Sequence, residues 1–262
     1  MKTIAMKFGG SSLADAAQFK KVASIIKSHE GKLYVVASAP GKRSKDDTKV
    51  TDMLYACYDS ASQKADFSAS LDAIKARFSE IIVNLGVAFD LDSEFSVIAK
   101  HLSSSPERDY MASRGEYLNS KILATYLGYD FIDPANYVFF GQDGVLNAER
   151  TNTELARALS KTDHAVVAGF YGTGSDGKVK TFSRGGSDVT GAIVARAAKA
   201  DVYENWTDVS GMLSADPRIV KDPDAIEEIS YKELRELSYM GASVMHEDAV
   251  FPVRSAGIPI NI

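Results

Sequence analysis

Short apolar runs alternate along the chain with stretches whose apolar residues recur at helical spacing. The apolar runs predict buried strands at 3–8, 32–39, 129–132, 137–140, 164–170, 201–206 and 259–262. The helical spacing predicts helices at 15–26, 50–65, 67–85, 93–102, 110–127, 153–159, 187–199, 231–239 and 247–256. Strands separated by helices favour a largely parallel sheet covered on both faces. The sequence therefore predicts an α/β fold, a three-layer α/β/α sandwich.

The first predicted strand runs directly into a glycine loop, Gly9-Gly10-Ser11-Ser12, and then into a helix. Two glycines at such a turn let backbone N–H groups approach an anion, and the helix N-terminus adds partial positive charge. Lys7 stands at the end of the strand, where its ammonium can point at the same anion. A tight turn with a surface lysine explains this segment alone equally well. The lysine before two glycines and two hydroxyls favours a phosphate site.

Composition limits the classes of function. With 262 residues, 45% hydrophobic and 25% charged, the chain is long enough for one large domain or two small ones. A net charge of −5 argues against a general nucleic-acid binder. The single cysteine, Cys57, excludes an internal disulfide and is expected in the core. No apolar run is long enough to span a membrane, and the N-terminus lacks a signal-peptide pattern, so we expect a cytoplasmic protein.

A second strand–glycine–helix junction occurs at 183–188, Ser-Arg-Gly-Gly-Ser-Asp. Arg184 offers a planar fork suited to a carboxylate or a phosphate. Asp188 could simply favour the helix dipole, but beside Arg184, and with a matching junction at Lys7, a role in orienting cations is favoured. The stretch 172–177 matches G-x-G-x-x-G, yet it leads into a β-like segment, so a hairpin turn is predicted instead of a nucleotide loop.

Three further features leave functional and ordinary interpretations open. Asp208 follows a predicted strand, where ligands bind in open α/β sheets, and could hold a ribose hydroxyl, while Arg218 could hold a phosphate. Turn chemistry explains both equally simply. Glu116 could face a site or be an ordinary first-turn acid. The four histidines show no metal-ligand spacing.

Taken together, these blocks resemble aspartate kinases of the amino-acid kinase superfamily. The matching stretches are 7–12, 50–54, 113–116, 183–190 and 206–211, in the family's order. The resemblance implies ATP-dependent phosphorylation of the L-aspartate side chain to 4-phospho-L-aspartate, the entry to lysine, threonine and methionine synthesis. The alternatives are a glutamate or acetylglutamate kinase and an inactive nucleotide-binding regulatory protein.

The resemblance also implies the residues of the phosphoryl-transfer site. Lys7 would neutralise the transferring phosphoryl group, and Asp188 would orient Lys7. Gly9, Gly10 and Ser11 would cradle phosphate oxygens. The nucleophile is a carboxylate that is already ionised at neutral pH, so no general base is required. Charge from Lys7 and Mg²⁺, together with positioning, must then supply the catalysis.

L-aspartate would be held by four other residues. Thr51 and Glu116 would bind it, with Glu116 facing its ammonium. Arg184 would clamp the α-carboxylate bidentately, and Ser187 would help to place the substrate.

The nucleotide would contact Thr207 and Asp208 through its nucleoside and Arg218 through its phosphates. Leu213 stands where many family members have a tyrosine near the adenine. Ser243 stands where many have a lysine, which leaves one fewer cation for the phosphates. ATP and Mg²⁺ are the implied cofactors, with Mg²⁺ held mainly by ATP phosphates and water and not by protein ligands.

The resemblance also suggests how the chain is organised. Residues 1–262 are expected to form one catalytic domain, with a helix-rich substrate lobe near 50–127. The chain stops roughly where the family's C-terminal ACT regulatory modules begin, so these modules are expected to be absent. The expected partners are L-aspartate and MgATP, with no nucleic acid and no membrane. The oligomeric state stays open, with a homodimer as one alternative.

Overall fold

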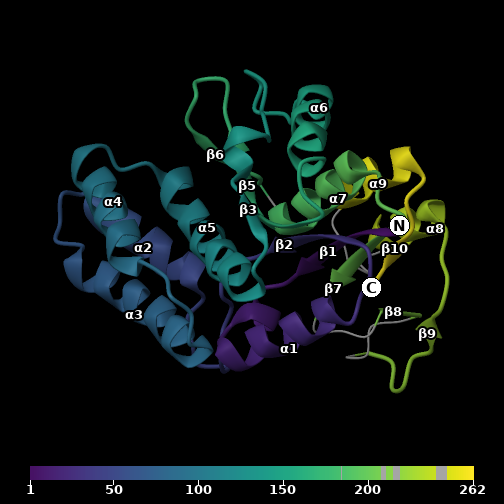
Figure 1. Cartoon of the computed structure of the whole chain (residues 1–262), viewed down its shortest axis with the longest axis horizontal. Helices are drawn as coiled ribbons and strands as arrows, with labels where there is room; N and C mark the ends of the chain where they lie inside the picture. The colour runs from purple at the N-terminus through teal and green to yellow at the C-terminus, as the bar shows by residue number, and fades with distance from the viewer. Residues whose placement is uncertain (184, 208–210, 215–218, 240–246) are drawn as a thin grey trace.

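The structure, a computed structural model, describes residues 1–183, 185–207, 211–214, 219–239 and 247–262 (Figure 1). At its centre lies a six-stranded sheet in the order β10-β7-β1-β2-β4-β3, in which every neighbouring pair is parallel. Its strands are β1 (Thr3–Phe8), β2 (Lys32–Ala37), β3 (Asp130–Ile132), β4 (His164–Ala168), β7 (Val202–Trp206) and β10 (Ile260–Asn261). The predicted parallel sheet with helices on both faces is confirmed.

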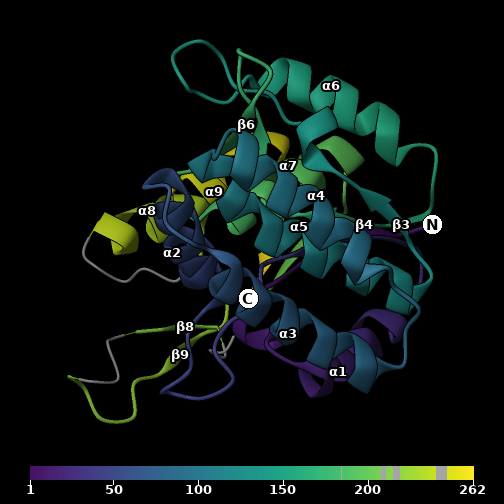
Figure 2. The same ribbon diagram turned by 90° about the vertical axis from the view of Figure 1, so that its left-hand side faces the viewer.

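Alternating side chains of the strands divide the core between two faces. Ile4, Met6 and Phe8 of β1 point to one face, which is covered by α1 (Ala16–Lys27), α2 (Val50–Ser62), α3 (Ser68–Leu85), α4 (Leu91–Ser104) and α5 (Arg108–Leu127). Ala5 points to the other face, which is covered by α6 (Ala148–Leu159), α7 (Gly186–Ala198) and α9 (Glu247–Ala256). This period of two gives a sheet buried on both sides. Figure 2 shows α1 and α3 on the opposite side of the sheet from α6.

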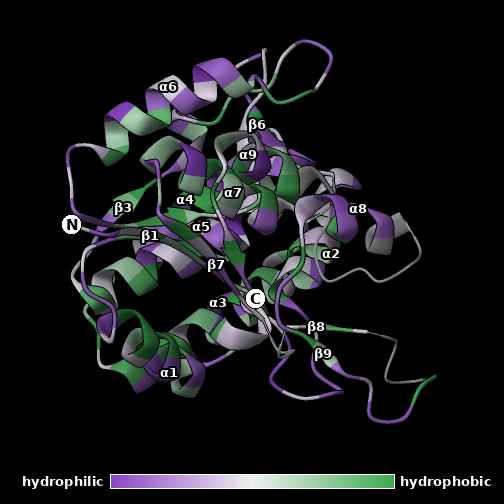
Figure 3. Cartoon of the chain, turned by 90° about the vertical axis from the view of Figure 1, so that its right-hand side faces the viewer, coloured by the Kyte–Doolittle hydropathy of each residue, from purple (hydrophilic) through white to green (hydrophobic). Residues whose placement is uncertain are grey.

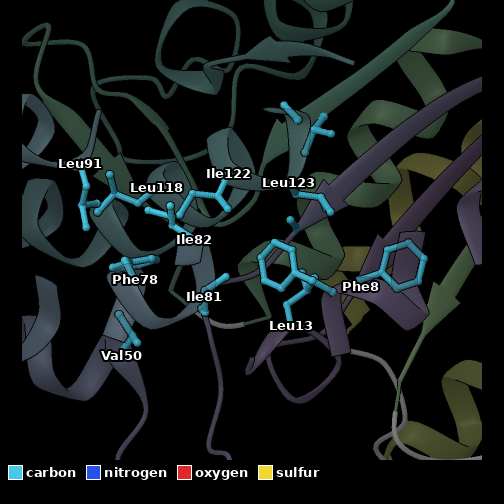
Figure 4. Close-up of a cluster of buried hydrophobic side chains, with 14 of the residues drawn as sticks. Phe8, Leu13, Val50, Phe78, Ile81, Ile82, Leu91, Leu118, Ile122 and Leu123 are labelled. Carbon is cyan, nitrogen blue, oxygen red and sulfur yellow. The ribbon is translucent and has the colours of Figure 1, made fainter. Parts of the chain in front are cut away.

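The larger of the two cores lies under α3 and α5. Phe78, Ile81 and Ile82 of α3 meet Leu118 and Ile122 of α5 in one buried cluster, as the close-up in Figure 4 shows. On the opposite face, Figure 3 shows hydrophilic residues along much of α6. The buried residues of α6 are Thr151, Leu155, Ala158 and Leu159, at helical spacing. Because α2, α3, α4 and α5 share the first core with the strands, the helix-rich stretch 50–127 packs against the sheet. Its role as a substrate lobe stays a prediction.

Several predicted elements end one to three residues earlier in the structure, as β2, α2 and β4 do, and two predicted elements differ more strongly. Residues 137–140 form no strand; a 3₁₀ helix at Pro134–Asn136 precedes them, and only isolated bridges at Phe139 and Phe140 follow. The helix expected at 153–159 begins at Ala148, because the Asn147 side chain accepts a hydrogen bond from the Arg150 amide and caps it. A short hairpin, β8 (Met212–Leu213) with β9 (Ala225–Ile226), was not predicted.

The hairpin predicted around 172–177 is confirmed. β5 (Tyr171–Thr173) pairs antiparallel with β6 (Val179–Thr181), and Gly177 in the turn has φ +78°. Positive φ at this position is the backbone conformation that glycine adopts without strain. The G-x-G-x-x-G spacing here is therefore turn chemistry. The remaining helix, α8 (Tyr231–Tyr239), packs beside α9.

The packing of α7 on the sheet leads to a prediction about stability. A Cβ added at Gly191 would lie 2.7 Å from Cζ of Tyr203, a fully buried side chain of β7. We expect Gly191→Ala to lower the free energy of unfolding by about 1–3 kcal/mol, measured by urea denaturation, even though alanine is the better helix former. In a double-mutant cycle, Tyr203→Phe should recover part of this loss, because the added methyl group also approaches the hydroxyl. Wild-type stability of Gly191→Ala would contradict tight packing here.

Candidate active site

A cavity of about 360 Å³ lies where the carboxyl ends of the central strands meet two helix N-termini. The chain passes from β1 to β2 on one side of β1 and later returns to β7 on the other. Ligands of open α/β sheets bind at such a switch point. Lys49 and Thr51 at the start of α2, and Gly185, Gly186 and Ser187 at the start of α7, line the cavity. Both helix N-termini favour a negatively charged ligand.

Lys7 is the central cation of this cavity. It lies near the end of β1, and its residue is only 8% exposed. Its Nζ atom lies 2.7 Å from Oδ1 of Asp188, in the first turn of α7. The ion pair therefore links the two strand–glycine–helix junctions found in the sequence. An ammonium held by a carboxylate at fixed distance is preorganised to meet an anionic group.

Glu116 is a buried carboxylate on α5 that faces the same cavity and is 6% exposed. Burial raises its pKa to about 8, although the backbone N–H of Ala39 donates to the carboxylate and lowers it. One oxygen, Oε2, is buried without a hydrogen-bond partner in the described part of the chain. A cationic group of a ligand would satisfy that oxygen. The ordinary interpretation, a first-turn acid, does not fit, because Glu116 lies beyond the first turn of α5, which begins at Arg108.

Helix α5 also fixes the end of β2 beside the cavity. Asn119, fully buried, donates from Nδ2 to the carbonyl oxygen of Ser38 at 2.7 Å. A Cβ at Gly115 would lie 2.7 Å from Cβ of Ala39, so glycine permits this close approach. Glu116, Asn119 and Gly115 thus hold Ser38 and Ala39 in place.

The two glycines after Lys7 have different surroundings. A Cβ at Gly10 would lie 2.8 Å from the Ala39 carbonyl oxygen and 3.2 Å from the Gly41 amide nitrogen, so Gly10 admits the neighbouring loop. Among the described residues, a Cβ at Gly9 would meet only Lys7 Nζ and the Trp206 carbonyl, at 3.7 and 3.9 Å. Gly9 is therefore the glycine with space for a ligand. Phosphate contacts of both residues stay predictions.

Phe170 lines the cavity in a backbone conformation that is unusual for a phenylalanine. Its φ is +79°, and its amide donates to Thr190 Oγ1 at 3.1 Å. A non-glycine residue at positive φ persists only where its surroundings hold it there. Gly186 makes room for it, because a Cβ at that glycine would lie 3.0 Å from Cα of Phe170. The sequence predicted Phe170 only as the last residue of a strand, and nothing in it indicated a positive φ or a place in the cavity wall.

The predicted site residues fall into three groups. The cavity brings together Lys7, Gly9, Gly10, Thr51, Glu116, Ser187 and Asp188. Three predicted residues do not line it: Ser11, in the 3₁₀ helix at Ser11–Leu13, Thr207, which follows β7, and Leu213, in β8. Arg184, Asp208, Arg218 and Ser243 lie outside the described residues. Six further residues line the cavity. Asp52, Gly185 and Gly186 belong to stretches that the sequence singled out but were given no role, and Ser38, Lys49 and Phe170 were not predicted.

Thr207 lies beside the cavity although it does not line it. Phe8 of β1 pairs with Trp206 of β7, and the Gly9 amide donates to the Trp206 carbonyl at 3.3 Å. Because Thr207 follows Trp206, it emerges at the same sheet edge as the glycine loop. This placement is compatible with the nucleoside contact predicted for Thr207, which stays a prediction.

The described residues also limit other kinds of chemistry. Among them, no cluster of three or more histidine, cysteine or acidic side chains could hold a metal ion. Cys57 is buried in α2, and burial raises the pKa of its thiol to about 11, as a core cysteine requires. Among the helices that the structure describes, none is long and apolar enough to cross a bilayer.

The fold and the cavity define an α/β protein with a pocket built around a buried lysine at the carboxyl ends of its strands. The sequence model described as "Amino acid kinase family" matches residues 2–262. The chain therefore belongs to the amino acid kinase family. It is 36% identical to aspartokinase 3 of Bacillus subtilis over 271 residues, which cover 98% of this chain and 60% of that protein.

Two solved structures extend the comparison. The crystal structure of aspartate kinase from Clostridium acetobutylicum superposes with a TM-score of 0.94 at 48% identity, covering 99% of this chain and 59% of that one. E. coli aspartokinase III in complex with lysine and aspartate superposes with a TM-score of 0.76 at 25% identity, covering 99% and 61%. The chain thus spans about three fifths of the length of these relatives.

Proposed function

We propose that this chain catalyses the ATP-dependent phosphorylation of the side-chain carboxylate of L-aspartate, the entry step to lysine, threonine and methionine synthesis. The observation that carries the proposal is the cavity in which the Lys7–Asp188 ion pair and the buried carboxylate of Glu116 meet. A free α-amino acid presents both an ammonium and carboxylates to such a site. The relatives named aspartate kinases, at 36% and 48% identity, support the same choice of substrate.

The amino-acid substrate is positioned by charge. Glu116 receives the ammonium at its unpartnered oxygen, and Thr51 and Ser187 line the cavity from the two helix N-termini. Arg184, by its place beside Gly185, is the predicted clamp for the α-carboxylate. E. coli aspartokinase III, at 25% identity, has been crystallised with aspartate, which supports aspartate as the amino-acid substrate.

Phosphoryl transfer then depends on bringing two anions together. The attacking carboxylate needs no general base, because it is ionised at neutral pH. Lys7 stabilises the negative charge that the phosphoryl group carries between the two oxygens, and Asp188 fixes the ammonium for that purpose. Thr207, Asp208, Leu213 and Arg218 are the proposed contacts of the nucleotide, with Gly9, Gly10 and Ser11 near its phosphates. Bound Mg²⁺, carried on the ATP phosphates, would supply further charge neutralisation.

A panel of acceptors tests the proposal. ADP release from MgATP should be fast with L-aspartate and at least about 10²-fold slower, in kcat/KM, with L-glutamate, N-acetylglutamate or UMP. N-acetylglutamate lacks the ammonium that Glu116 would bind, so it distinguishes a free amino-acid site from an acylated one. Trapping the product with hydroxylamine should give an acyl hydroxamate, as an acyl phosphate does. Preference for glutamate or N-acetylglutamate would reassign the substrate, and no ADP release with any acceptor would favour a nucleotide-binding protein without catalysis.

A further inference from the structure

A second and larger cavity, of about 720 Å³, lies on the face of the sheet covered by α6 and α7. It is bounded by the loop before α6, by β6 and the segment after it, and by α7 and α9. Figures 1 and 2 show α6, α7 and the β5–β6 hairpin on the same side of the molecule. Among the residues that the structure describes, none lines both this cavity and the one around Lys7. Its volume is in the range of small-molecule sites.

Most of its wall is apolar. Phe140, Phe182 and Leu146 come from the loops, and Val189 and Ile193 from α7. Phe251 of α9, one of the exposed large apolar side chains at 63% exposure, lies at the rim. An apolar hollow of this size would bury the hydrocarbon body of a ligand.

The charged side chains of the cavity wall differ in whether they have hydrogen-bond or ion-pair partners within the protein. The Asp109 carboxylate already accepts hydrogen bonds from the Thr181 amide and hydroxyl, at 3.2 and 3.0 Å. Asp143 accepts one from the Val145 amide at 3.0 Å. The guanidinium of Arg196, half-buried in the last turn of α7, has no hydrogen bond or ion pair with any residue that the structure describes, and the exposed Lys180 ammonium has none either. Both carboxylates accept hydrogen bonds from within the protein, whereas the two cationic side chains are open to a ligand.

We propose that this cavity binds a small carboxylic acid with an apolar body, whose carboxylate pairs with Arg196. Ile193, Val189 and Arg196 stand at helical spacing on one side of α7, so the guanidinium is placed at the end of an apolar stripe. A guanidinium binds a carboxylate through two parallel hydrogen bonds, and the apolar surroundings strengthen that pair. Ala148, in the first turn of α6, brings the positive end of that helix to the same cavity.

The placement of α7 connects the two cavities. Ser187 and Asp188 at the start of this helix line the Lys7 cavity, whereas Val189, Ile193 and Arg196 along its length line the second cavity. The binding proposal does not depend on the proposed kinase function, and its test is a binding measurement without nucleotide.

Phenylacetate is a suitable probe, because it has one carboxylate and one apolar ring. Titration calorimetry should give one site with a Kd of about 0.1–1 mM, as befits so small a ligand. Phenylacetamide, of the same shape without the charge, should bind at least about 10-fold more weakly. Arg196→Gln should weaken phenylacetate by a similar factor, and Ala148→Trp should abolish binding by filling the hollow. The matched control is Arg157→Gln, because Arg157 lies on α6 in an ion pair with Glu154 and does not line the cavity.

Several results would overturn the proposal. These are no binding up to about 10 mM phenylacetate, equal binding of the amide, or unchanged binding by a folded Arg196→Gln protein. Displacement by L-aspartate would place the probe in the Lys7 cavity instead. Displacement by equimolar inorganic phosphate would show an anion site without preference for an apolar body. Arg196→Lys, which keeps the charge, should retain partial binding, and circular dichroism checks that each variant folds.

Discussion

Lys7→Ala should lower kcat for phosphoryl transfer by about 10²–10³-fold, the usual cost of removing one preorganised charge contact from such a site. Lys7 is the buried cation at the end of β1, and its Nζ atom is held 2.7 Å from Asp188. Removing it leaves the attacking carboxylate and the phosphoryl group to repel each other. Initial rates of ADP release at saturating L-aspartate and MgATP measure the effect.

The variant also removes the partner of a carboxylate, so stability needs its own control. Asp188 would remain partly buried without its cation, which can destabilise the protein. Lys7→Met with Asp188→Asn removes both charges and keeps side-chain volume, and should fold while remaining inactive. Lys20→Ala, at an exposed position of α1, controls for the loss of a lysine. Near-normal turnover by a folded Lys7→Ala protein would exclude Lys7 from the mechanism.

The sheet could be predicted because its strands are short apolar runs buried on both faces. The same signal failed at 137–140. That segment is apolar because Val138 and Phe140 are buried, yet it forms only isolated bridges. Apolar content reports burial, whereas a strand also needs consecutive pairing along a neighbouring strand, and this segment has only single bridges among the described residues. The early start of α6 could have been read from Asn147, a side chain that caps helices.

The candidate site was predicted only in part, because its residues come together through tertiary packing. Lys7 and Asp188 belong to junctions with a sequence pattern, and the structure joins them. The burial of Glu116 has no local signal, because it depends on α5 lying against the end of β2. Phe170 also lacks a local signal, because nothing in the residues around it indicates its positive φ. Gly10 shows that a glycine in a phosphate-loop pattern can be required by a neighbouring backbone.

Glu116→Gln should raise KM for L-aspartate by about 10²-fold with a much smaller change in kcat, because it removes a charge that binds substrate and does not touch the transferring group. In the ligand-free protein, burial raises the pKa of Glu116 to about 8, so at pH 6.5–7.5 the carboxyl is mostly protonated. Only the ionised form can pair with the substrate ammonium. Binding of aspartate at neutral pH must therefore release the proton of Glu116.

The release of this proton determines how the affinity for aspartate changes with pH. As pH rises from about 6 toward 8, the cost of ionising Glu116 falls, so the apparent affinity for aspartate should increase by up to about tenfold per pH unit and level off above the pKa.

Calorimetry at pH 7 in buffers of different ionisation enthalpy should find close to one proton released per aspartate bound to the wild type. The Glu116→Gln protein, which has no such proton, should release almost none and show a flat profile over the same range. A wild-type affinity that does not change between pH 6 and 8, or equal proton release by both proteins, would mean that Glu116 does not face the substrate ammonium. The pairing would then have to be sought at another carboxylate of the cavity, of which Asp52 at the start of α2 is one.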